Sequence, residues 1–149
     1  MVVPYKIVID CADPHRLAAF WAQALEYVVE DHADLVRQLL AAGAVQEADT
    51  TAVDGRLGWA AAAAVRDPDA PVDPQSGVGL GGRVLFQAVP EPKTVKNRVH
   101  LDLHVGPQRR DDVVADLVAR GATVLWHGQQ GPSSWVTLAD PEGNEFCVA

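Results

Sequence analysis

The stretch NRVHLDLHVGPQRRDDVVADLVARGATVLWHGQQGPSSWVTLADPEGNEFCVA (residues 97–149) decides the fold. Its first nine residues alternate in polarity, which is typical of a strand. Residues 107–120 repeat apolar side chains at helical spacing and end at a glycine, which favours a helix. Three apolar runs then follow, at 122–128, 134–140 and 144–149. The second half of the chain is therefore predicted to be strand, helix and three strands.

The first half begins in the same way. YKIVIDC (residues 5–11) predicts a strand, and Asp13 and Pro14 predict the start of an amphipathic helix. A second helix is expected at 34–42, Ala60–Ala64 is interpreted as a short strand, and the residues 67–82 are expected to form a loop. These features indicate a weak internal repeat of the type strand, helix and three strands.

Length and charge restrict the class of protein. The 149 residues fit one domain, and the two cysteines, Cys11 and Cys147, lie in apolar runs where a buried free thiol is expected. The net charge is −8, of which the first 75 residues carry −7 through 5 basic and 12 acidic side chains. This balance argues against nucleic acid as a partner, because phosphate contacts need clustered Lys and Arg. No apolar run is long enough for a membrane span, so we expect a cytoplasmic protein.

One strand carries the residue types that most suggest chemistry. Alternation in NRVHLDLHV places four polar residues on one face, namely Arg98, His100, Asp102 and His104. The strands RVLFQAV and NEFCVA show sparser polar residues, including Gln87, Glu145 and Cys147. Sparse polar groups among apolar ones are typical of a pocket wall, whereas a regularly polar face is typical of a solvated surface.

Three segments together resemble the vicinal oxygen chelate superfamily, which includes glyoxalases, bleomycin-resistance proteins and extradiol dioxygenases, and within it the uncharacterised glyoxalase-like branch. The segments are CADPHRLAAFWAQAL, LFQAVPEPKTVKNRVHLDLHV and WVTLADPEGNEFCV. The resemblance implies an α+β fold of two βαβββ modules whose strands form a curved mixed sheet. It places module one at about 1–92, with a helical insertion at about 31–73, and module two at about 93–149, within a single domain.

The resemblance also implies four positions for metal ligands, which in this chain are Lys6, Gln87, His100 and Cys147. Only His100 is an ordinary ligand, and Glu145 is the nearest acidic substitute for Cys147. A divalent metal site needs more ligating side chains than this set provides, so no metal is favoured. The alternative is a site for Zn, Fe, Mn or Ni formed by His100, Gln87 and Glu145.

Without a metal, His100 and Asp102 are the candidate catalytic pair, because a histidine beside a carboxylate serves as a general acid or base. The same pair also fits a merely structural hydrogen bond. Cys147 is expected to be structural, since a nucleophilic thiolate needs a nearby base. The remaining candidates for ligand binding are Gln87, Trp59, Asn97, Arg98, Trp126, Trp135, Glu145 and Cys147.

The sequence thus predicts a protein that binds a small organic compound and forms a homodimer. We expect an enzyme in which His100 transfers protons with little or no metal dependence. One alternative is a non-catalytic protein that sequesters its ligand, as bleomycin-resistance proteins do. The other is a metal-dependent lyase or dioxygenase.

Overall fold

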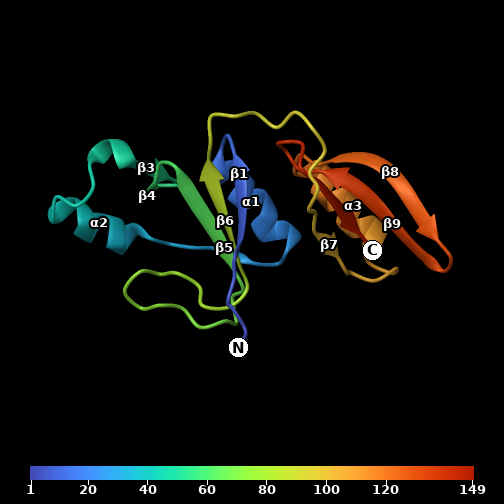
Figure 1. The fold of residues 1–149 in the computed structure, drawn as a ribbon, viewed down its shortest axis with the longest axis horizontal. Helices are drawn as coiled ribbons and strands as arrows, with labels where there is room; N and C mark the ends of the chain where they lie inside the picture. The colour runs from blue at the N-terminus through green and yellow to red at the C-terminus, as the bar shows by residue number, and fades with distance from the viewer. The chain divides into compact units, whose positions relative to one another are not determined.

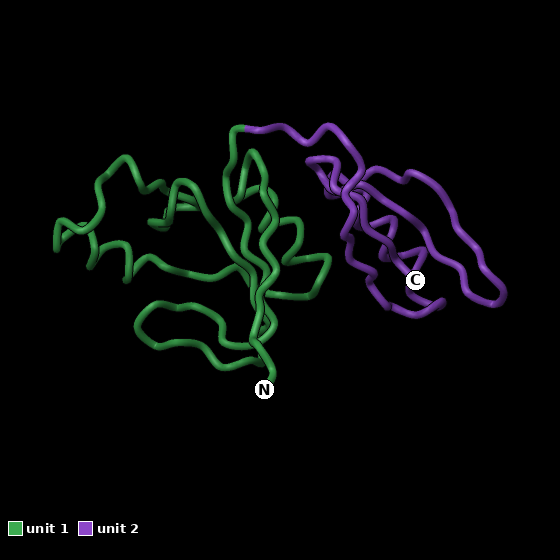
Figure 2. Tube along the Cα trace, in the orientation of Figure 1, with its two compact units in different colours: residues 1–90 green, residues 91–149 purple.

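The computed structural model describes all 149 residues, and the chain forms two compact units, Met1–Pro90 and Glu91–Ala149 (Figure 2). Each unit has its own sheet and is described by itself. None of the α-helices has the length and apolar character needed to span a membrane.

Unit 1 contains a four-stranded sheet with the order β1-β6-β5-β2. Along the chain its repeat elements are β1 (Ile7–Cys11), α1 (Pro14–Ala24), β2 (Val28–Val29), β5 (Ala62–Arg66) and β6 (Arg83–Ala88) (Figure 1). β1 runs parallel to β6, and the other pairs are antiparallel. Helix α1 packs on β5 and β6. The interpretation of the alanine-rich run as a strand is confirmed by β5.

Unit 2 repeats this topology with the order β7-β10-β9-β8. Its elements are β7 (Asp102–Leu103), α3 (Arg110–Ala119), β8 (Thr123–Gln130), β9 (Ser133–Ala139) and β10 (Glu145–Val148). β7 is parallel to β10, as β1 is to β6. The predicted fold of two βαβββ modules is therefore confirmed.

Unit 1 carries further elements between β2 and β5. They are α2 (Ala33–Ala41), the 3-10 helix η1 (Glu47–Asp49), and a hairpin of β3 (Thr50–Val53) and β4 (Arg56–Trp59). Unit 2 has no counterpart, because β8 connects directly to β9 through a short turn at Gly131. The predicted helical insertion is thus α2, and the hairpin accompanies it.

Local chemistry explains where the helix α1 begins. The Oδ1 atom of Asp13 accepts a hydrogen bond from the Arg16 backbone N–H at 3.0 Å, and Pro14 follows in the first turn. This satisfies one of the backbone donors left free at a helix start. The helix then buries Leu17 and Trp21 against the sheet. The chain therefore passes from β1 into α1 at the position that the sequence predicts.

Two expectations about boundaries were wrong. The strand expected at 97–105 is assigned only at β7, although backbone hydrogen bonds from Cys147 and Ala149 to Leu101 and Leu103 continue the pairing on both sides of it. The helix expected from residue 107 begins at Arg110, after a turn. A turn that starts at Gly106, with φ of 84°, takes up residues 107–109, which the pattern had assigned to the helix.

Candidate functional site

The register of unit 2 brings three chemically active side chains together. β7 and β10 pair Asp102 with Cys147, and His100 precedes Asp102 by two residues on the same side of the chain. The potential ligand atoms of His100, Asp102 and Cys147 all lie within 4.8 Å of one another. We call these three residues the His100 cluster.

Asp102 is the central member of the His100 cluster. Its Oδ1 atom lies 3.3 Å from Nε2 of His100, and the two side chains are 52% and 41% exposed. The Cys147 thiol, which is buried, also donates a hydrogen bond to the Asp102 carboxylate. A carboxylate at this distance favours the imidazole tautomer that carries its proton on Nε2.

The thiol of Cys147 is held in its protonated form. Burial raises the pKa of Cys147, and the negative charge and hydrogen bond of Asp102 raise it further, against the opposing effect of Thr137. The Thr137 Oγ1 atom lies 3.4 Å from Sγ. Since the thiolate is the nucleophilic form, this environment disfavours nucleophilic chemistry at Cys147.

The donor set of the His100 cluster also fits a divalent metal. Imidazole nitrogen, carboxylate oxygen and thiolate sulfur are all ligands of zinc, and three protein ligands leave a coordination position open. A metal held by these residues would supply Lewis-acid chemistry. Of the four ligand positions that the resemblance implies, His100 and Cys147 belong to this cluster, whereas the alternative set of His100, Gln87 and Glu145 shares only His100 with it.

Glu145 is occupied by contacts within its own unit. Lys93 Nζ donates to Oε1 at 3.0 Å, and the Asn97 backbone N–H donates to Oε2 at 3.1 Å. Burial opposes ionisation of Glu145, but these two donors outweigh it and lower the pKa of the carboxyl group. The Asn97 side chain donates to Oδ1 of Asn144 at 2.8 Å. Glu145 and Asn97 therefore fasten the segment that precedes β7, and Lys93 is a partner that the sequence reasoning missed.

Two tryptophans lie on the same face of the unit 2 sheet as the His100 cluster. Thr137 pairs with Cys147 on one side and with Trp126 on the other, so all three side chains share a face. Trp135 is two residues before Thr137 and lies against the backbone of Gly128. Trp126 is 47% exposed. Arg98, by contrast, is an exposed residue outside any strand.

Gln87 and Trp59 belong to unit 1. β6 pairs Gln87 with Asp10, which is the relation that β10 and β7 give to Cys147 and Asp102. In this register the unit 1 residue equivalent to His100 is Val8, and Lys6 precedes β1. Unit 1 thus has no histidine at the equivalent position.

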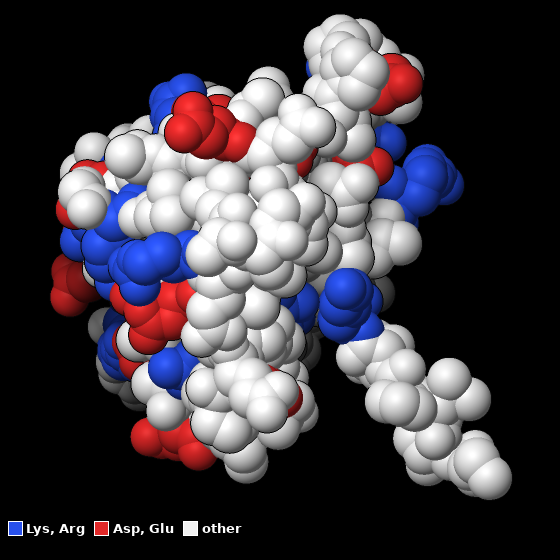
Figure 3. All heavy atoms as spheres, turned by 90° about the vertical axis from the view of Figure 1, so that its left-hand side faces the viewer, with Lys and Arg blue, Asp and Glu red and all other residues white.

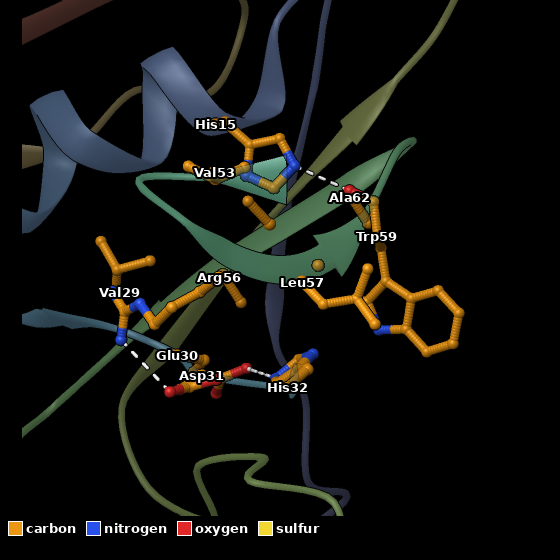
Figure 4. Close-up of a pocket in the computed structure, with 13 residues that line it drawn as sticks. His15, Val29, Glu30, Asp31, His32, Val53, Arg56, Leu57, Trp59 and Ala62 are labelled. Carbon is orange, nitrogen blue, oxygen red and sulfur yellow. Dashed lines mark hydrogen bonds and ion pairs between the residues drawn. The ribbon is translucent and has the colours of Figure 1, made fainter. Parts of the chain in front are cut away.

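Trp59 lines a pocket that the sequence reasoning did not predict (Figure 4). It is formed by the inserted hairpin, the start of α1, the segment after β2, and β5. The Trp59 carbonyl oxygen accepts a hydrogen bond from Nε2 of His15 at 2.7 Å. The Asp-Gly pair at residues 54–55, with positive φ at both, was the sequence signal for this hairpin.

The paired βαβββ topology and the cluster on a strand face define a class of proteins, and comparisons with known proteins identify it. A family model described as "Glyoxalase-like domain" matches residues 6–149, so the chain belongs to the glyoxalase-like domain family, within the vicinal oxygen chelate superfamily. A search of curated proteins finds no match.

Solved structures with the same fold share little sequence with this chain. A glyoxalase/bleomycin resistance protein/dioxygenase family enzyme from Burkholderia phytofirmans is 15% identical, with a TM-score of 0.58 over 96% of this chain and 94% of that one. The fosfomycin resistance protein FosX from Mesorhizobium loti is 9% identical, with a TM-score of 0.61 over 99% and 90%. A mutant FosX from Listeria monocytogenes, complexed with Mn(II) and 1S,2S-dihydroxypropylphosphonic acid, is 8% identical, with a TM-score of 0.60 over 99% and 90%. These likenesses show the fold.

Proposed function

We propose that this protein is an enzyme that acts on a small organic molecule, with His100 as the group that accepts and returns a proton. The observation that carries the proposal is the Asp102 carboxylate, 3.3 Å from Nε2 of a histidine that is 41% exposed. A histidine that is both oriented and accessible is what general acid–base catalysis requires.

In this proposal each member of the His100 cluster has a role. With its proton on Nε2 and facing Asp102, the neutral imidazole presents the lone pair of Nδ1 as the base. After proton transfer, the negative charge of Asp102 stabilises the imidazolium. The Cys147 thiol, as a hydrogen-bond donor, holds Asp102 from the other side. Trp126 and Trp135 provide aromatic surface for a flat or cationic substrate on the same face.

The first experiment is a turnover screen. Purified protein is incubated with small electrophiles, including fosfomycin and the adduct of a 2-oxoaldehyde with a thiol, and products are followed by proton NMR. For any substrate found, His100→Ala is expected to lower kcat about 100-fold or more, in keeping with typical general-base effects. His127→Ala is the matched control. This histidine pairs with Val136 on β9, and its side chain lies on the face of the sheet opposite to the His100 cluster. Equal turnover by His100→Ala and the native protein would refute the role of His100.

A metal-dependent lyase or dioxygenase reaction is the second candidate, favoured by the short distances within the His100 cluster. Elemental analysis of protein purified without added metal separates the two candidates. Full turnover by protein that contains no Zn, Fe, Mn or Ni after EDTA treatment supports the first, and loss of turnover that one of these metals restores supports the second. Saturable binding of a compound without turnover would instead indicate a protein that sequesters its ligand.

We also propose a homodimer, which light scattering of the purified protein would test. A monomer at all concentrations would contradict it.

A further inference from the structure

Unit 1 contains a pocket whose lining residues are separate from the His100 cluster. We call it the hairpin pocket, and its lining is His15, Val29, Glu30, Asp31, His32, Val53, Arg56, Leu57, Gly58, Trp59 and Ala62–Ala64. The cavity volume is about 60 Å³. The cavity exists because β5 presents three alanines and β4 a glycine, none of which fills the space beneath the hairpin.

The two histidines of the hairpin pocket are held in one tautomer. Nε2 of His15 lies 2.7 Å from the Trp59 carbonyl oxygen, and Nε2 of His32 lies 2.8 Å from Oε2 of Glu30 (Figure 4). Both partners are hydrogen-bond acceptors, so Nε2 carries the proton in each ring. In the neutral form each histidine then offers the lone pair of Nδ1 as an acceptor to a ligand.

Glu30 is not available to a ligand. Its side chain is fully buried, and it accepts four hydrogen bonds from Gly79, Arg83 and His32. Arg83 balances its charge. The carboxylate that a ligand can reach is therefore the neighbouring Asp31.

Asp31 lies at the edge of the pocket and has one atom that can exchange partners. Oδ1 accepts from the Ala33 backbone N–H at 2.9 Å at the start of α2, whereas Oδ2 accepts from Arg56 at 3.2 Å. The Asp31 and Arg56 side chains are 50% and 59% exposed. An ion pair with this exposure contributes little, so a competing cation can replace Arg56 at Oδ2.

We propose that the hairpin pocket binds a small organic ammonium ion that has an apolar or aromatic body. The ammonium group pairs with Oδ2 of Asp31 and donates to a histidine Nδ1. The body contacts Val53, Leu57 and the β5 alanines, beside the face of Trp59, which attracts cations.

The charge of unit 1 favours this choice over an anion. Its residues 1–90 contain 6 Lys or Arg and 12 Asp or Glu, a net charge of −6. Figure 3 shows acidic and basic side chains interspersed on the displayed surface, with no large patch of one sign. In addition to this net charge, Asp31 and the two imidazole acceptors provide local selectivity for a cation.

The test uses benzylammonium as the probe and benzoate as the anionic control, at pH 8, where imidazole is ordinarily neutral. Binding is followed by the NMR resonance of the Trp59 indole N–H, which Trp59→Phe identifies. Benzylammonium is expected to shift this resonance saturably, and benzoate at equal concentration to leave it unchanged. The full-length chain is used throughout.

Two variants are expected to change the affinity for benzylammonium in opposite directions. Asp31→Asn keeps an oxygen for the Ala33 N–H but removes the charge, and is expected to weaken binding about fivefold. Arg56→Gln removes the competing cation and is expected to tighten binding. The proposal is overturned if benzoate binds and the two effects are reversed, because that result defines an anion site. It is also overturned if benzylammonium leaves the Trp59 resonance unshifted.

Discussion

Arg83 donates to both carboxylate oxygens of Glu30, 53 residues away in the sequence, from Nε to Oε1 at 2.7 Å and from a terminal nitrogen to Oε2 at 2.8 Å. The same carboxylate accepts from the Gly79 backbone N–H and from His32. One buried residue thus connects the end of β2, the loop before β6, and the start of α2. The floor of the hairpin pocket depends on this connection.

Replacement of Glu30 is therefore expected to be costly. Glu30→Gln leaves the buried guanidinium of Arg83 without its counter-charge, and we expect a loss of about 3 kcal/mol in the free energy of unfolding. Asp34→Asn is the matched control, because Asp34 pairs with Arg37 on the exposed surface of α2 and should cost under about 1 kcal/mol. Urea denaturation measures both. Equal losses in the two variants would show that the buried Glu30–Arg83 ion pair contributes no more to the free energy of unfolding than an exposed pair does.

The same pair predicts acid sensitivity. Burial opposes ionisation of Glu30, but hydrogen bonds from His32, Arg83 and Gly79 outweigh it and lower the pKa from the ordinary 4.5 to about 2. Because the pKa of Glu30 is lower in the folded protein than in the unfolded chain, its ionisation stabilises the fold by about 3 kcal/mol at any pH above the unfolded-state pKa. This contribution is lost as the pH falls from 4.5 towards 2. The stability difference between the native protein and Glu30→Gln should therefore shrink across this range. A constant difference from pH 7 to pH 3 would contradict the assignment.

The sequence predicts those elements whose signals are local. Asp13 and Pro14 marked a helix start correctly, and alternation over residues 97–105 placed His100 and Asp102 on one face, where their side chains lie 3.3 Å apart. The contact of Asp102 with Cys147 depends on the pairing of β7 with β10, and no local pattern reports such a register. Glu30 was missed for the same reason, since its partner Arg83 lies far along the chain.

The absence of a side chain at Gly128 is expected to be necessary for the packing of the Trp135 indole. A Cβ atom at residue 128 would clash with the Trp135 indole, which lies over this strand. Gly128→Ala should therefore displace the indole, with a loss of about 2 kcal/mol and a change in tryptophan fluorescence. Gly131→Ala is the control, because nothing lies within 4 Å of the added atom. Its positive φ of 56° should cost about 1 kcal/mol without a fluorescence change. A native spectrum for Gly128→Ala would show that Trp135 does not occupy this position.

Glu145 tests whether contacts within the protein hold the segment of residues 93–97, before β7, in place. Its two carboxylate oxygens hold Lys93 and the backbone of Asn97, so Glu145→Ala should release residues 93–97. Trypsin should then cleave after Lys93 and Lys96 several times faster than in the native protein, because a released backbone enters a protease more readily. Glu91→Ala, which removes an exposed carboxylate nearby, should leave the cleavage rate unchanged. If Glu145 serves instead to bind a ligand or metal, Glu145→Ala will be cleaved at the native rate. In that case the ion pair with Lys93 does not hold the segment, and Glu145 returns to the set of candidate ligands beside His100.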